Sequence, residues 1–140
     1  MSSKIIIDAA DGIVGRVASF TAKEALMGKE VIVVNCSHSV LTGTKRATLA
    51  KYKKARARGG AAIKGPHFPK SSERIMKRTI RGMLPYKKGR GEAAFKRIKC
   101  YIGIPEEFHG KKFETIVNAN VKKLQSLKYT TVEQLCKLLR

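Results

Sequence analysis

The stretch IIIDAADGIVGRVASFTAKEALMGKEVIVV, residues 5–34, decides the fold of this chain. It opens and closes with β-branched runs, residues 5–7 and 31–34, which are typical of buried strands. Between them Asp11-Gly12 predicts a turn, the apolar residues then take helical spacing, and Gly28 ends the helix. The face of this helix that should pack inward carries Val14, Val17, Ala18, Thr21 and Ala25. Strand, helix and strand, with strands apolar on both faces, predict a βαβ unit in a parallel sheet covered on both sides.

Positive charge gathers in the middle of the chain. Residues 45–99 hold 19 Lys and Arg and two acids, a net charge of +17 in a total of +20. A compact chain with so much charge of one sign repels itself and needs an external counter-charge. A phosphate backbone is the usual partner, and the sequence pI of about 10.3 is typical of nucleic-acid-binding domains.

The basic region has three predicted parts. Residues 45–58 should form a helix with cations on every side and no apolar face. Residues 59–70, GGAAIKGPHFPK, predict a loop that orders when it binds RNA, with a loop pinned by its own prolines against the sheet as the alternative. A second helix, capped by Ser71-Ser72, runs to about Gly82 and ends before Pro85. Its cations occupy one face, opposite an apolar face: Arg74, Lys77, Arg78 and Arg81.

The remaining third of the chain has weaker signals. Glycines 89 and 91 open a predicted helix that runs through Ile98, and residues 99–102 predict a strand. Residues 113–124 give no clear secondary-structure signal, and we interpret them as a short strand and a loop. Thr130-Thr131 should cap a final helix with an apolar face of Val132, Leu135, Cys136 and Leu139. Without a repeat or a linker, the pattern predicts a single domain over residues 1–140.

Catalytic, metal and membrane functions are disfavoured by the same sequence. Three cysteines and three histidines are scattered without metal-ligand spacing, so they should be buried or incidental side chains. Gly12-x-x-Gly15 lacks the rest of a dinucleotide or P-loop motif, which favours a tight turn. Asp8 and Asp11 should serve that turn. The sequence also has no apolar run that predicts a membrane span or a secretory leader, which favours a cytoplasmic protein.

Several motifs together resemble one family. These are DAADGIVGRVAS at residues 8–19, LTGTK at 41–45, and the segment from Lys64 to Pro105 that contains RGMLP at 81–85. They resemble universal large-subunit ribosomal protein thirteen over essentially the whole chain, and the short C-terminal part, with FETIVNANVKKL, is similar to the archaeal branch. The resemblance implies a three-layer α/β/α fold with a small, mostly parallel four-stranded sheet. It also implies a turn at residues 82–85 that fixes the basic helix against the sheet.

The family's role would be structural: binding of large-subunit rRNA, support of subunit assembly and translation, contacts with neighbouring ribosomal proteins, and no cofactor, metal, small-molecule substrate, membrane or catalysis. The residues that the resemblance and the charge pattern assign to RNA are Lys45, Arg46, Lys53, Lys54, Arg56, Arg58, Lys64, His67, Lys70, Arg74, Lys77, Arg78, Arg81, Lys87, Lys88 and Arg90. Tyr52, Phe68 and Tyr86 lie among them as candidates for stacking. Two alternatives stay open: a free-standing basic RNA-binding or RNA-chaperone domain, and a nucleotide-using enzyme built on the βαβ unit.

Overall fold

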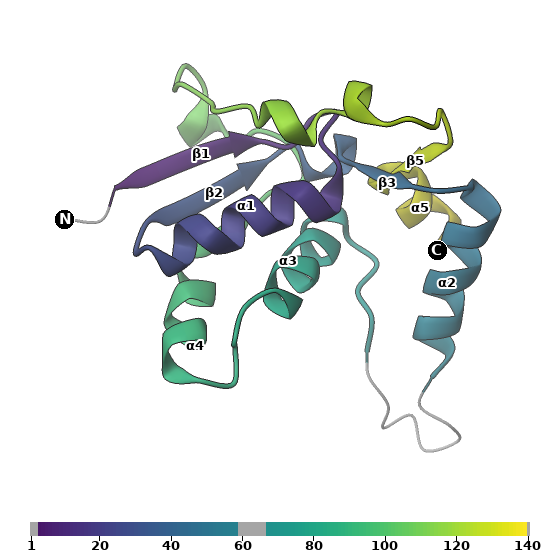
Figure 1. Cartoon of the computed structure of the whole chain (residues 1–140), viewed down its shortest axis with the longest axis horizontal. Helices are drawn as coiled ribbons and strands as arrows, with labels where there is room; N and C mark the ends of the chain where they lie inside the picture. The colour runs from purple at the N-terminus through teal and green to yellow at the C-terminus, as the bar shows by residue number, and fades with distance from the viewer. Residues whose placement is uncertain (1–2, 59–66, 140) are drawn as a thin grey trace.

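The predicted βαβ unit is confirmed in the computed structural model, which describes residues 3–58 and 67–139 (Figure 1). Strand β1 (Lys4–Asp8) leads through helix α1 (Val14–Leu26) to strand β2 (Glu30–Val34). The two strands are parallel, with Ile5 opposite Val31. Gly28 follows the helix with φ of +94°, a backbone conformation that glycine adopts without the steric cost of a side chain.

A third strand extends this sheet on the far side of β2. Strand β4 (Ile98–Cys100) is parallel to β2, which gives the order β1-β2-β4. The predicted boundaries were wrong here: Ile98 was assigned to the preceding helix, and the strand was placed at residues 99–102. Ile98 pairs with Val31 and is fully buried, and Arg97 ends the helix before it. Tertiary pairing therefore starts the strand one residue earlier, and the chain leaves the sheet after Cys100.

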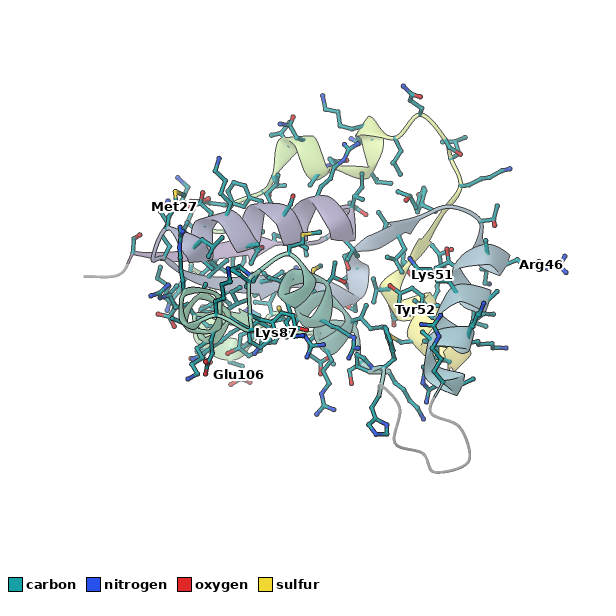
Figure 2. The ribbon with its side chains drawn as sticks, turned by 60° about the horizontal axis from the view of Figure 1, so that its bottom comes forward. Met27, Arg46, Lys51, Tyr52, Lys87 and Glu106 are labelled. Carbon is teal, nitrogen blue, oxygen red and sulfur yellow. The ribbon has the colours of Figure 1, made fainter. Side chains whose placement is uncertain are left out.

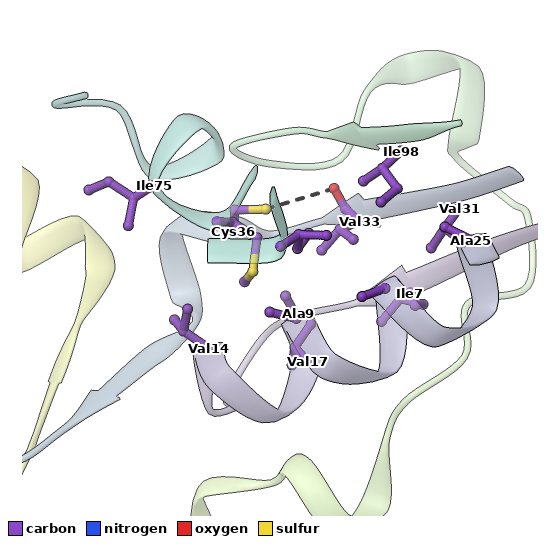
Figure 3. Close-up of a cluster of buried hydrophobic side chains, with 14 of the residues drawn as sticks. Ile7, Ala9, Val14, Val17, Ala25, Val31, Val33, Cys36, Ile75 and Ile98 are labelled. Carbon is purple, nitrogen blue, oxygen red and sulfur yellow. Dashed lines mark hydrogen bonds between the residues drawn. The ribbon is translucent and has the colours of Figure 1, made fainter. Parts of the chain in front are cut away.

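The two faces of the sheet are covered in different ways. Alternate residues, such as Ile7, Val31 and Val33, join the main core with α1, α3 (Ser72–Gly82) and α4 (Gly89–Lys96) (Figure 3). The residues between them, including Ile6 and Ile32, pack on Phe108 and its neighbours in the segment 101–113. The only helix in that segment is the 3-10 turn η2 (Glu106–Phe108). The expected three-layer α/β/α arrangement is thus not confirmed, because a segment interrupted by glycines and Pro105 covers the second face.

The expected fourth strand of the parallel sheet is not confirmed either. Within the described residues, β3 (Val40–Thr42) and β5 (Tyr129–Thr131) form a separate antiparallel pair. From the ambiguous region, Glu114 alone bridges to the edge of β1: its N–H donates to the carbonyl of Ile6 at 2.8 Å, and its carbonyl accepts from Asp8 N at 3.0 Å. The chain then forms two 3-10 turns, η3 (Val117–Ala119) and η4 (Val121–Lys123), which cannot continue a ladder.

The pair of helices α2 and α5 corrects one further expectation. Helix α2 (Lys45–Ala57) does have an inward side, because Thr48 is buried and Tyr52 packs against the main core, near α5 (Val132–Leu139). Helix α5 begins as predicted, with the Thr131 hydroxyl accepting from the backbone N–H of Gln134 at 3.3 Å.

Two smaller features complete the fold. Ser71 occupies the N-cap position of α3 as predicted, but its side chain makes no capping hydrogen bond. A 3-10 turn, η1 (Cys36–His38), joins β2 to β3. In the part of the chain that the structure describes, no helix is long and apolar enough to cross a membrane.

Candidate nucleic-acid interface

Helix α3 separates its cations from its apolar side chains as the sequence predicts. Ile75, Met76 and Ile80 are buried in the main core, while the stripe of Arg74, Lys77, Arg78 and Arg81 lies outside it. Leu84, in the turn that follows, is also buried in that core. The helix is therefore anchored along one side and at its end, so its cationic side keeps a fixed direction.

Three of the four stripe cations lie against aromatic rings. The Arg78 guanidinium is 4.0 Å from the centre of the Phe68 ring. The Lys77 ammonium is 5.0 Å from the ring of Phe95. The Arg81 guanidinium is 5.1 Å from the ring of Tyr86. Such contacts contribute about 0.5–1 kcal/mol each at exposed sites, which is enough to restrict the long side chains before any ligand arrives.

The stripe lines a groove. Arg78 Nη1 donates to the carbonyl of His67 at 3.3 Å and so holds the segment 67–69 beside α3. The hollow enclosed by that segment, the four cations and Phe95 measures about 390 Å³, and we call it the stripe groove. A second hollow of about 230 Å³ lies where Tyr52 of α2 meets Phe68 and α3. Cations, rings and hollows are thus contiguous from α2 to α4.

Helix α2 carries the next group of predicted contacts. The Thr44 hydroxyl caps it by accepting from Ala47 N at 3.3 Å. Its exposed cations include Arg46, which extends away from the body of the protein (Figure 2). In Figure 1, α3 and α4 lie below the strands β1 and β2, and α2 runs downward at the opposite end of the molecule. The exposed candidates on and just after α2 are Lys45, Arg46, Lys53, Lys54 and Arg58.

The other candidates fall into four groups. His67 and Lys70 are exposed before α3, and Lys87, which Figure 2 labels, Lys88 and Arg90 are exposed on the turn and first residues of α4. Arg56 differs: it is half-buried, and its Nη1 donates to the carbonyl of Leu139 at 2.6 Å, so its guanidinium holds α5 on α2. Lys64 and the rest of residues 59–66, including most of the loop predicted to order on binding, lie outside the described residues.

Negative charge does not offset this surface. Within residues 3–58 and 67–139, the ion pairs are Lys29–Glu24, Lys96–Glu92 and Lys137–Glu133. None of them involves a residue assigned to RNA. The surface therefore keeps a high density of uncompensated positive charge, which favours a polyanion as its partner.

The residues considered for other chemistry have structural roles. A side chain on Gly12 would place its Cβ 2.8 Å from Val17 Cγ2, so the glycine permits close packing of the turn on α1. Asp8 Oδ1 accepts from Ala10 N and from Asn35 Nδ2, both at 3.0 Å, which confirms its place in the turn. In the described ranges no group of His, Cys, Asp and Glu could hold a metal ion.

The buried titratable groups also disfavour nucleophilic chemistry. A hydrogen bond with the Cys100 side chain, together with burial, raises the pKa of the Cys36 thiol far above its ordinary value, which keeps it protonated. The thiol lies in the main core beside the Val33 carbonyl (Figure 3). Burial also raises the pKa of the Tyr52 hydroxyl.

One part of the interface was missed from the sequence. Phe68 and Tyr86 do contact stripe arginines, whereas Tyr52 is half-buried in the core contact of α2. Phe95 was read only as part of a helix, yet its ring lies under Lys77. No local pattern could reveal this pair, because it depends on where the turn after α3 places α4.

The comparison with known sequences decides the family. The sequence model described as "Ribosomal protein L13" matches residues 2–107. The chain belongs to this family. Among curated relatives, the large ribosomal subunit protein uL13 of Archaeoglobus fulgidus is 42% identical over 135 residues, which cover 96% of this chain and 86% of the relative. The uL13 of Methanosarcina barkeri is 46% identical over 125 residues, 89% of each chain.

A third relative, uL13 of Methanococcoides burtonii, is 44% identical over 127 residues, 91% of each chain. These three L13-family relatives are archaeal, which confirms the resemblance to the archaeal branch. The L13 match includes α1, α2, α3 and α4, and therefore every described element of the cationic surface.

Proposed function

We propose that this protein is a structural constituent of the large ribosomal subunit that binds large-subunit rRNA. Its relatives are named large ribosomal subunit proteins. The observation that carries the proposal is the α3 stripe, three of whose cations are positioned by Phe68, Phe95 and Tyr86, and none of which forms an ion pair within the described residues. Because arginine and lysine contact phosphate oxygens, a row of pre-positioned cations favours binding to an RNA backbone.

Contacts in the stripe groove would fix the position of the RNA backbone on the protein. The cations of α2 and of the start of α4 would extend this interface on either side. Phosphate contacts fix orientation without reading sequence, and the chain has no recognised base-reading module. An unpaired nucleotide could stack on the exposed side of the groove, near His67 and Phe68. The proposed contacts are the four stripe cations and the exposed candidates named above, with Lys64 included on the sequence alone and Arg56 serving mainly the fold.

Residues 1–140 would act as a single rRNA-binding domain that supports subunit assembly and translation in the cytoplasm. One core cluster joins residues of α1, α3, α4 and α5, which supports a single folding unit. Other large-subunit proteins would be its neighbours. The proposal includes no cofactor and no catalysis, since the family is one of ribosomal proteins. The same membership favours the ribosomal role over a free-standing RNA chaperone.

Charge reversal of the stripe tests the proposal. The Arg74→Glu, Arg78→Glu double variant should fail to enter the large subunit while keeping its far-UV circular dichroism, because neither side chain belongs to the core. With free rRNA, we expect the log–log salt slope to fall by about 2, one unit for each lost phosphate contact. The matched control reverses two exposed lysines elsewhere, Lys23→Glu and Lys112→Glu. Normal incorporation of the stripe variant would refute the proposed interface.

A further inference from the structure

A further hollow, which shares no lining residue with the stripe groove, has a different character. It measures about 460 Å³ and is lined by Glu73, at the start of α3, and by residues 100–105, where the chain leaves β4. We call it the Glu73 hollow. Tyr101, Ile104 and Pro105 give it apolar walls, and Ile102 at its side is 52% exposed. Among the described residues, none that is assigned to rRNA lines it.

Glu73 is an unusual residue in this position. It is one of two acids among residues 45–99, and none of the ion pairs within the described residues uses it. Its Oε2 atom is buried and has no hydrogen-bond partner in the described part of the protein. A buried carboxylate oxygen without a donor is destabilising, and native proteins rarely leave such an atom unsatisfied. A donor from outside the chain would remove this penalty.

The wall opposite Glu73 is held in place by hydrogen bonds. The backbone N–H of Cys36 donates to the carbonyl of Tyr101 at 3.2 Å, and the Ser37 hydroxyl donates to the carbonyl of Ile102 at 3.0 Å. Ile102 also lines an adjoining hollow of about 360 Å³, next to Ser72 and α5. The exposed Ile102 side chain is therefore shared by two hollows on a pre-formed surface, which suits an extended chain laid across it.

We propose that the Glu73 hollow binds a lysine or arginine side chain from an extended segment of a neighbouring ribosomal protein. This inference rests on the proposed function. The cationic head donates to Glu73 Oε2, and the aliphatic stem packs on Tyr101 and Ile102, as long basic side chains do on apolar surface. The exposed Glu106 and Glu107, next in the chain after Pro105, add attraction for a basic partner.

The other occupants fit less well. A phosphate would be repelled by the Glu73 carboxylate, so the rRNA backbone is a poor ligand for this hollow. A divalent cation prefers several oxygen ligands, and the described residues contain no metal-ligating cluster. A basic side chain satisfies both the carboxylate and the apolar walls.

A small-molecule titration tests the chemistry on the free protein. Acetyl-arginine N-methylamide is added to the isotope-labelled protein, and the amide resonances of residues 100–104 are followed by NMR. We expect saturable shifts, with affinity lowered about fivefold or more by Glu73→Gln, because a charged acceptor is replaced by a neutral one. The control variant Glu114→Gln, an exposed acid beside β1, should bind normally. Acetyl-norleucine N-methylamide should not bind. Unchanged affinity in Glu73→Gln would overturn the proposal.

Crosslinking in assembled subunits tests the class of partner. Ile102 is replaced by the photoreactive p-benzoylphenylalanine, and purified large subunits are irradiated and analysed by mass spectrometry. We expect a crosslink to a lysine- or arginine-containing stretch of another ribosomal protein, weakened when Glu73→Gln is added. Crosslinking only to rRNA, or to nothing, would overturn the assignment of a protein partner. If the wild-type chain did not enter subunits, the proposed function and this partner would both be refuted, while the arginine titration would still decide the chemistry of the hollow.

Discussion

Replacing Gly91 with alanine tests how α4 is placed beside the stripe. A Cβ at Gly91 would lie 2.0 Å from the carbonyl oxygen of Pro85, 2.2 Å from its carbonyl carbon and 2.8 Å from Tyr86 N. Backbone atoms cannot rotate away as a side chain can, so α4 would have to separate from the turn before it. Phe95, on the same helix, would then move relative to Lys77.

The expected loss of stability follows from this clash. Overpacked sites lose about 1–3 kcal/mol, and we expect the upper end, about 3 kcal/mol, because both partners are backbone. In a chain of this size that loss lowers Tm by roughly 10 °C. Urea unfolding followed by circular dichroism measures the free energy. We also expect weaker rRNA binding, because the displaced Phe95 ring would no longer position Lys77.

Gly89 supplies the matched control in the same helix. A Cβ there would meet nothing within 4 Å. Gly89→Ala should leave stability within about 1 kcal/mol of wild type, in the stabilising direction, because alanine restricts the unfolded chain. If Gly91→Ala and Gly89→Ala unfolded at the same urea concentration, the close approach of α4 to Pro85 would be wrong, and so would the reasoning that places Phe95 by it.

Two further predictions separate structural residues from RNA contacts. Arg56→Gln should lose about 1–2 kcal/mol of stability, because its hydrogen bond to Leu139 is broken, and should leave the salt slope of rRNA binding almost unchanged. Lys54→Gln, on an exposed side chain, should keep the stability and reduce the salt slope. A reduced slope for Arg56→Gln alone would contradict this division. Burial raises the pKa of the Tyr52 hydroxyl above 10.0, so the folded protein holds this proton more tightly than the unfolded chain does. The resulting stability is present below about pH 10 and is lost as pH rises through the folded pKa. Urea titrations at increasing pH should therefore show a smaller loss of unfolding free energy in Tyr52→Phe than in wild type.

Expectations based on local pattern agreed well with the structure. The alternation of β-branched and helical spacing in residues 5–34 predicted β1, α1 and β2, because a run apolar on both faces has few stable places outside a buried parallel sheet. The split between Ile75, Met76 and Ile80 and the cationic stripe predicted which side of α3 packs inward. Each pattern repeats within a few residues, so it can be read without knowing what lies across from it.

Expectations that needed distant partners failed. Helix α2 shows no apolar face in sequence, yet Thr48 and Tyr52 pack inward, because α5, some eighty residues later, supplies the other half of the contact. β3 and β5 are three residues each, which is too short for a periodic signal in the sequence. Each is a strand because it pairs with the other. The predicted fourth parallel strand was reduced to the single bridge at Glu114 for a similar reason.

The sequence alone therefore determined the βαβ unit, the charge of the surface, the direction of the α3 stripe and the family. Only the tertiary structure decided which rings lie under Lys77, Arg78 and Arg81, that Arg56 serves the fold, and that Glu73 lines an apolar hollow with an unsatisfied oxygen. The physical reason is the separation along the chain between the residues that interact. Hydrophobic periodicity and net charge are properties of neighbouring residues, whereas a stacked cation, a shared hydrogen bond or a hollow exists only once segments far apart in the chain are packed together.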